Sequence, residues 1–185
     1  MKIKLNKVRL SFPDLFEAVQ YQGSGPFNYG AQFLIPADST LKKSIDAAIQ
    51  SVAKEKWGAK AAAILTEILP DKKACCWIDG NRREYDGYAG NWAISAKRLQ
   101  DKGAPLVLDT NKSALTAKSG RIYAGCYVNA SIEIYAQDSK NGKGIRCELL
   151  AVQFDSEGDS FGGGTAPSAD DFDDLAVGAD AEELV

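Results

Sequence analysis

The sequence predicts a mainly β domain, built as a small open barrel or sandwich, with a helical insertion after the second strand and an acidic tail. Three observations predict it. The strand-like segments are enough for an antiparallel barrel of five or six strands, and the longest of them, 124–136, alternates apolar with polar residues at a period of two, as half-buried strands do. Helical periodicity occurs within residues 40–68, and from residue 156 onward Gly, Ser, Ala, Asp and Glu dominate.

The first strand covers residues 2–12, and its apolar pattern changes halfway along. Ile3 and Leu5 share one parity, whereas Val8 and Leu10 share the other. A single extra residue in a strand shifts parity in this way, so we expect a β-bulge near Asn6.

Two helices are expected after a second strand over residues 29–35. Apolar residues recur at helical spacing within 40–56, with Asp38 or Ser39 as the N-cap. A shorter helix covers 59–68. The apolar stripe of the first helix consists of Leu41, Ile45, Ile49 and Val52.

The remaining strands follow the helices. The longest has the clearest alternation, with one parity starting at Cys126 and turned to the core, and the other starting at Tyr127 and turned to solvent. A polar turn over 138–144 then lets the last strand pair back as a hairpin. The strands expected here are 74–78, 91–99, 106–108, 124–136 and 145–154.

The charge of the chain is divided between its two parts. The net charge is −3, but ten of the 25 acidic residues lie in 155–185, a stretch without Lys or Arg. Residues 1–154 therefore contain 15 acidic and 22 basic residues, which gives them a net charge of +7. We therefore expect a basic folded domain over 1–155 and a disordered acidic tail over 156–185.

The tail contains apolar residues that solubility alone does not require. They lie within two acidic clusters. This pattern favours a tail that docks in a basic, apolar pocket of a partner, or that transiently occupies the basic groove of its own domain. The alternative is a tail that only improves solubility. The residues expected to bind a partner are Asp170, Asp171, Phe172, Asp173, Asp174, Glu182, Glu183 and Leu184.

Several chemistries are excluded by composition. The chain has no His, which removes catalytic triads and His-based metal sites, and its four cysteines lack the spacing of a zinc site. There is no phosphate-binding GxxxxGK[ST] motif, and the acids of 79–86 alternate with Arg82 and Arg83, which indicates local ion pairs. We expect no enzyme, no metal and no cofactor. The chain has no run of 18 apolar residues and no signal-peptide pattern, so we expect no membrane contact and reduced cysteines.

Basic residues interleaved with aromatic ones suggest binding to single-stranded nucleic acid, because cations pair with phosphates and flat rings stack on unpaired bases. Tyr85 and Tyr88 lie in a Gly-rich loop, where neither side chain has to be part of a core. The pattern around Trp92 fits a core position and a surface position equally well. The expected stacking residues are Tyr85, Tyr88, Trp92 and Tyr127, with Phe27 and Tyr29 as second choices. The expected phosphate-binding residues are Arg82, Arg83, Lys97, Lys4 and Lys7.

Four segments resemble a family of single-stranded DNA-binding proteins from tailed phages, which is distantly similar to the single-stranded DNA-binding protein of T7-like phages. They are RLSFPDLF (9–16), YGAQFLIP (29–36), DGYAGNW (86–92) and RIYAGCYVNA (121–130). The resemblance implies an OB-fold, a role in phage replication or recombination in the cytoplasm of the bacterial host, and an acidic tail that contacts replication proteins and competes with DNA.

Two features depart from the pattern that this resemblance implies. The helices follow the second strand rather than the third, so we interpret them as an insertion. The chain ends in Glu-Glu-Leu-Val rather than in a terminal Phe. Two other functions stay open at this point: an interaction module that uses the barrel as a scaffold, and an OB protein that binds RNA.

Overall fold

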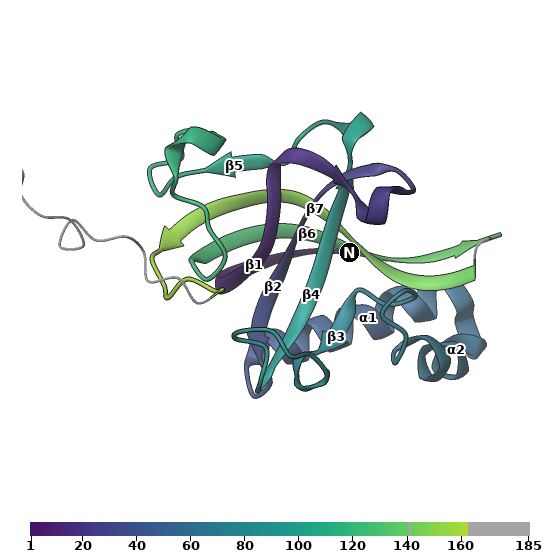
Figure 1. The fold of residues 1–185 in the computed structure, drawn as a ribbon. Coiled ribbons are helices and arrows are strands. Elements are labelled where there is room, and N and C mark those ends of the chain that lie inside the picture. The colour runs from purple at the N-terminus through teal and green to yellow at the C-terminus, as the bar shows by residue number, and fades with distance from the viewer. Residues whose placement is uncertain (141, 163–185) are drawn as a thin grey trace, which may run out of the picture.

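Five strands close into a barrel in the computed structural model, which describes residues 1–140 and 142–162 (Figure 1). They pair in the order β4–β2–β1–β6–β7, and β7 returns to β4 through a parallel contact between Lys97 and Glu148. This arrangement confirms the predicted OB-type barrel. The strands are β1 (Lys2–Gln20), β2 (Phe27–Pro36), β4 (Asn91–Leu99), β6 (Tyr127–Ser139) and β7 (Gly142–Ser156).

Two short strands extend the sheet on either side of the barrel. β3 (Trp77–Asp79) pairs with β4, and β5 (Leu106–Leu108) runs parallel to β7. The predicted strands therefore all exist; 91–99 and 106–108 have the predicted ends, and the ends of the others are shifted. Short 3₁₀ turns join the elements: η1 (Tyr21–Gly23), η2 (Gly58–Lys60), η3 (Gly80–Arg82), η4 (Gln100–Lys102) and η5 (Ala117–Ser119).

β1 is irregular at three places and longer than predicted, and the third irregularity lies between Asp14 and Val19 in its pairing with β2. Its pairing with β6 shifts between Leu5 and Val8, where Lys7 adopts a φ of 48°, so the predicted bulge is confirmed. A second shift, in the pairing with β2, lies between Ser11 and Asp14. Pro13 falls within this second irregularity, where the regular ladder is interrupted, and the strand therefore continues past a residue that has no amide hydrogen.

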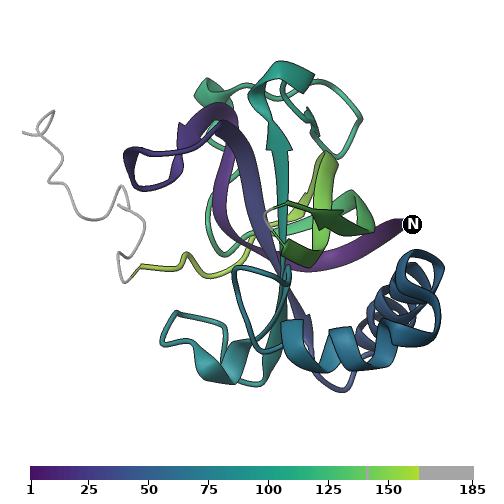
Figure 2. The ribbon, with the colours of Figure 1, turned by 90° about the vertical axis from the view of Figure 1, so that its right-hand side faces the viewer.

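The helices are inserted after β2, as predicted. α1 (Thr40–Trp57) begins after Ser39, whose side chain accepts a hydrogen bond from the amide of Lys42 at 3.1 Å. α2 (Ala61–Ile68) follows after η2, and Figures 1 and 2 place both helices together beside the barrel. α1 packs against β6 and buries Ile45, Ala48, Ile49, Val52 and Ala53.

A polar link ties α1 to the sheet. The indole Nε1 of Trp77 donates to Oδ1 of Asp46 at 2.9 Å, and Lys42 Nζ lies 2.7 Å from the other carboxylate oxygen. The same ammonium group lies 4.7 Å from the centre of the Trp92 ring, and the two indole rings are 5.1 Å apart. Both tryptophans are therefore part of the packing between helix and sheet.

The main core fills the barrel and the space under α1 and α2. The alternation of β6 is confirmed, because Val128, Ile132 and Ile134 are fully buried, whereas Tyr127 and Glu133 on the other parity are partly exposed. A second, smaller cluster lies on the outside of the sheet. It consists of Leu34, Tyr88 and Ala93, with Ile78 and Phe161 packed against them.

The described chain does not leave the barrel at residue 156, where the sequence predicted that disorder begins. Residues 157–162 pack back onto it: the Tyr123 hydroxyl donates to the carbonyl of Gly158 at 2.9 Å, and the Phe161 amide donates to the carbonyl of Ala124 at 2.9 Å. The apolar ring of Phe161 explains the difference, since it finds a place on the second cluster. The rest of the predicted tail, from residue 163, lies outside the described residues.

Replacing Asp46 by Ala should lower the free energy of unfolding by about 1–2 kcal/mol, because the largely buried indole of Trp77 loses its acceptor. Urea denaturation followed by tryptophan fluorescence measures this. Asp138→Ala is the matched control, since Asp138 pairs with Lys143 on an exposed hairpin at 3.7 Å and should cost well under about 1 kcal/mol. Equal losses in the two variants would contradict a structural role for Asp46.

Candidate nucleic-acid interface

The outward face of β1, β2 and β4 has a floor of small and polar side chains. In the pairing of β2 with β4, Gly30 lies opposite Lys97 and Gln32 lies opposite Ser95, while Ser11 of β1 lies opposite Gln32 on its other side. These residues alternate with buried ones along their strands and so share the outer face. Tyr88 covers Ser11 and its hydroxyl lies on Gln32, so an extended polymer could lie across the half-buried Gly30 and Ser95 beside it.

Two exposed aromatic rings stand together at this floor. Phe12 is 47% exposed and Tyr85 is 53% exposed, and their ring centres lie 5.1 Å apart in an edge-to-face arrangement. Phe12 sits in the second irregularity of β1 with a φ of 47°. Leu10 and Leu15 on either side are buried, so the irregular backbone accounts for the exposure of an apolar ring here.

Tyr88 is not available for stacking, and this part of the prediction needs correction. Its side chain is 1% exposed, and its hydroxyl lies 2.8 Å from Oε1 of Gln32 and 3.3 Å from the hydroxyl of Ser11. Burial raises the pKa of the Tyr88 hydroxyl. The Gly-rich loop folds back onto the sheet, so that Tyr88 packs against its outer surface and carries Tyr85, 5.4 Å away, beside the floor.

Trp92 and Tyr29 also lie elsewhere than their predicted roles require. Trp92 is half-buried between Trp77 and the ammonium group of Lys42, on the helix side of the sheet. Tyr29 is half-buried and has the parity of Ala31 and of the other inward residues of β2. Because side chains alternate along a strand, the inward parity of both residues directs their side chains away from the outer face, where we expected them to stack on bases.

Tyr127 lies on the outer face among cations, as predicted. The guanidinium carbon of Arg9 is 5.7 Å from its ring centre, and Lys7 Nζ is 6.0 Å from it. Lys4 is exposed on the same side of β1, opposite Ser131 of β6. This part of the sheet therefore combines one partly covered ring with three basic side chains.

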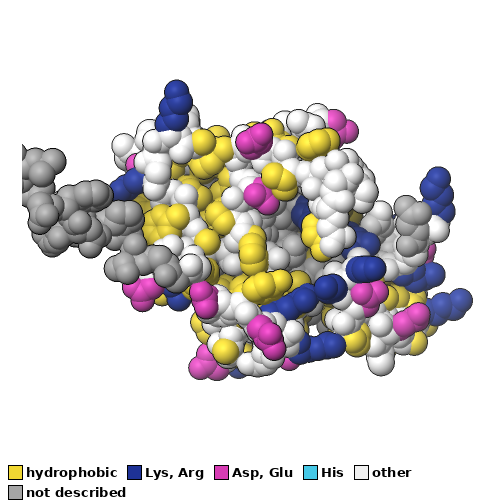
Figure 3. Space-filling view, viewed as in Figure 1, with side chains coloured by type: hydrophobic (Ala, Val, Ile, Leu, Met, Phe, Trp, Pro, Cys, Tyr) yellow, Lys and Arg dark blue, Asp and Glu magenta, His cyan; other side chains and the backbone are white. Residues whose placement is uncertain are grey.

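The other end of the floor carries a second ring and cation. Lys97 is exposed, and its Nζ lies 5.8 Å from the ring of Tyr21, which is 69% exposed. Phe27 is exposed nearby, at the start of β2 opposite Gln20 of β1. Figure 3 shows Lys and Arg side chains gathered over the lower right of the face seen in Figure 1, with apolar side chains beside them.

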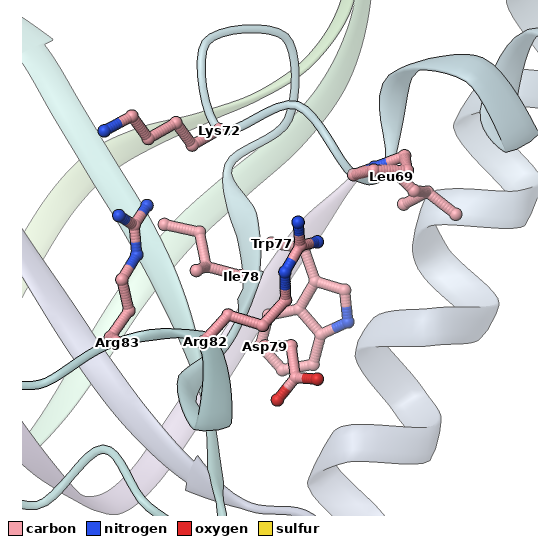
Figure 4. A pocket seen from close by; sticks show the side chains of 8 residues that line it. Leu69, Lys72, Trp77, Ile78, Asp79, Arg82 and Arg83 are labelled. Carbon is pink, nitrogen blue, oxygen red and sulfur yellow. The ribbon is translucent and has the colours of Figure 1, made fainter.

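Arg82 and Arg83 line a shallow pocket of about 160 Å³ at the β3 edge of the sheet (Figure 4). Lys72 is the third cation of this pocket, and Leu69 and Ile78 are among its apolar residues. None of the ion pairs found among residues 1–140 and 142–162 includes these three cations. Asp79 lines the same pocket without an ion pair to Arg82 or Arg83 among the described residues, contrary to the local ion pairs that the sequence suggested.

Three residues of this face were not among the expected binding residues: Phe12, Tyr21 and Arg9. Phe12 continued the apolar parity of Val8 and Leu10 and so looked like a core residue. The following Pro13 was the signal that β1 becomes irregular there.

Some predictions fall outside this geometry. The tail residues Asp170, Asp171, Phe172, Asp173, Asp174, Glu182, Glu183 and Leu184 lie outside the described residues. Within the described ranges, no group of three or more Cys, Asp or Glu could hold a metal ion, and all four cysteines are free and buried. No described helix is long and apolar enough to cross a membrane.

Comparison with known proteins agrees with the resemblance seen in the sequence. The family model described as "Enterobacter phage Enc34, ssDNA-binding protein" matches residues 1–185. Protein p50 of Acyrthosiphon pisum secondary endosymbiont phage 1 is 50% identical over 187 residues, which cover 100% of this chain and 99% of that protein.

Solved structures show the same relationship. The single-stranded DNA-binding protein of bacteriophage Enc34, in complex with single-stranded DNA, has a TM-score of 0.71 and 29% identity over 87% of this chain and 89% of that one. A C-terminal truncation of that protein has a TM-score of 0.70 and 26% identity, over 86% of this chain and 88% of that one. The single-stranded DNA-binding protein gp2.5 of bacteriophage T7 has a TM-score of 0.54 and 15% identity, over 100% of this chain and 98% of that one. This similarity supports the fold alone.

The family consists of DNA-binding proteins rather than enzymes, as the composition had led us to expect. Its model covers the whole sequence, and the barrel with its helical insertion matches the solved structures. The chain therefore belongs to the family of phage single-stranded DNA-binding proteins represented by that of Enterobacter phage Enc34.

Proposed function

We propose that this protein binds single-stranded DNA without sequence preference, with the strand lying across the outward face of β1, β2 and β4. The observation that carries the proposal is the floor of small and polar side chains at Gly30, Gln32 and Ser95, with the exposed rings of Phe12 and Tyr85 beside it. Family membership supports it, as does the related protein whose structure contains single-stranded DNA.

The chemistry of this face suits unpaired bases. A ring that stacks on a base contributes about 1–3 kcal/mol whatever the base is, because every base has a flat π-face. We assign stacking to Tyr85, Phe12 and Tyr127, with Tyr21 and Phe27 at the far end of the floor.

Cations on both sides of the floor would pair with the phosphates. We assign this role to Arg9, Lys4, Lys7 and Lys97, and to Arg82 and Arg83 at the pocket. Each phosphate neutralised on a single strand releases counterions, so the logarithm of the affinity falls by about 0.7 per phosphate for each tenfold rise in salt.

We assign the acidic tail two roles, competition with DNA and recruitment of replication proteins. Residues 163–185 carry seven acidic residues and no basic ones, next to a domain whose residues 1–154 have a net charge of +7. Tethering gives such a segment a high effective concentration at the basic face. Once DNA displaces it, Phe172 and Leu184 with their acidic neighbours could bind a polymerase, helicase or recombinase. The protein would act in phage replication or recombination in the cytoplasm of the bacterial host.

Replacing Tyr85 by Ala, or Phe12 by Ala, should weaken binding to oligo-dT by about 1–3 kcal/mol, roughly 5- to 150-fold, because one stacked ring is lost. Fluorescence anisotropy of a labelled oligonucleotide at fixed salt measures the change. Tyr135→Ala is the matched control: Tyr135 is 43% exposed on β6, opposite Arg146 of β7, and its ring is not among those that pair with Phe12, Tyr85 or Tyr88 in the described structure. If Tyr135→Ala weakens binding as much as Tyr85→Ala, the interface is misplaced.

Removing residues 163–185 should tighten binding to oligo-dT at low salt, with the gain shrinking as salt screens the charges. The length-matched control keeps the tail and replaces its seven acidic residues by Asn and Gln. This variant should behave like the truncated protein, because charge rather than bulk competes with DNA. Equal or weaker binding by both variants would contradict self-competition.

A further inference from the structure

Residues 157–162 form a strap that lies on the barrel without regular secondary structure. The Tyr123 hydroxyl holds its first half, since it donates to the Gly158 carbonyl at 2.9 Å and lies 3.1 Å from the Gly158 amide. Arg9 Nη2 donates to the Asp159 carbonyl at 2.6 Å. The strap therefore binds to side chains and backbone of the outer face rather than to a neighbouring strand along its length.

The ring of Phe161 fills a narrow slot in this face. The guanidinium carbon of Arg9 lies 4.3 Å from the ring centre, and Leu34 and Tyr88 belong to the apolar cluster on which the ring packs. Gly87 forms the end of the slot: it has a φ of 78°, and a Cβ there would lie 2.5 Å from the tip of the ring. The slot thus fits one flat ring with a cation over it.

The slot is continuous with the candidate interface. Tyr88 contacts the Phe161 cluster on one side, and its ring centre lies 5.4 Å from that of Tyr85 on the other. Arg9 contacts both Phe161 and Tyr127. A strand that stacks on Tyr85 and pairs with Arg9 would therefore pass over the slot.

We propose that this slot is a nucleobase-binding site and that Phe161 occupies it until DNA displaces the ring, an inference that rests on the proposed function. A guanidinium over a flat ring is the arrangement that an Arg also offers to an unpaired base. Phe161 is only half-buried, and the strap contributes no strand to the barrel, so the ring can leave without opening the fold.

Occupation of the slot has a cost for DNA binding. A ligand that binds only the form with an empty slot has its apparent affinity reduced by the fraction of molecules in that form. This effect is separate from the charge of the tail, because Phe161 carries none. The strap also ends beside the interface, because the Gly162 amide donates to a carboxylate oxygen of Asp86 at 3.0 Å.

The test compares variants of the full-length chain for binding to oligo-dT by anisotropy. Phe161→Ala empties the slot and should tighten binding about tenfold, which corresponds to about 1.4 kcal/mol. Tyr123→Phe loosens the strap, leaves the slot intact and should tighten binding to a smaller extent. Ser160→Ala is the control on the same strap, because it keeps the ring, and should leave affinity unchanged. Thermal denaturation checks that each variant is folded.

Hydrogen exchange of the wild-type protein gives an independent measurement. The Phe161 amide is bonded to Ala124, so its exchange should become faster when oligo-dT is added, while the amides of β2 become slower. Unchanged or weaker binding by Phe161→Ala, or slower exchange of the strap with DNA, would overturn the slot as a base site. Failure of the wild type and all variants to bind oligo-dT would instead overturn the proposed function, and the slot proposal with it.

Discussion

The irregular course of β1 is the constraint on which the rest of the structure depends. One strand of 19 residues pairs with β6 through its first half and with β2 through its second, and Arg9 lies opposite both Tyr127 and Leu34. A regular strand of this length would hold both neighbours in one gently twisted sheet, whereas the irregularities at Lys7 and Phe12 add bend and twist. A φ near +48° is costly for residues with a side chain, so the closed barrel must stabilise it.

The same irregularities create the chemistry of the outer face. The shift at Phe12 accompanies an apolar ring exposed beside Tyr85, and the shift at Lys7 places a basic residue next to Tyr127. Buried Tyr88 supports this arrangement from below, because its hydroxyl bonds with Ser11 and Gln32 of two strands while its ring touches Tyr85. The proposed binding surface and the closure of the barrel therefore depend on the same irregularities of β1, and the strap with Phe161 covers another part of this face.

The sequence predicted the parts of the fold that depend on periodicity. The alternation of β6, the helices after β2 and the bulge near Asn6 follow from local patterns, and all three are present. The site was harder to predict, because it depends on how the loop over 80–90 folds onto the sheet. Parity could not show that Tyr88 packs onto the outer surface of the sheet while Tyr85 is exposed to solvent, since a loop has no period. Trp92 was undecided from the sequence, and the contacts with Lys42 and Trp77 account for its burial.

The central claim is that single-stranded DNA lies across β1, β2 and β4, and amide chemical shifts test it most directly. A titration of the ¹⁵N-labelled protein with oligo-dT should move the signals of Gly30, Gln32, Ser95 and Lys97 on the floor, and of Tyr85 beside it. Signals of β5 and of the exposed side of α1 should stay in place. Shifts confined to those elements, with the floor unchanged, would contradict the account.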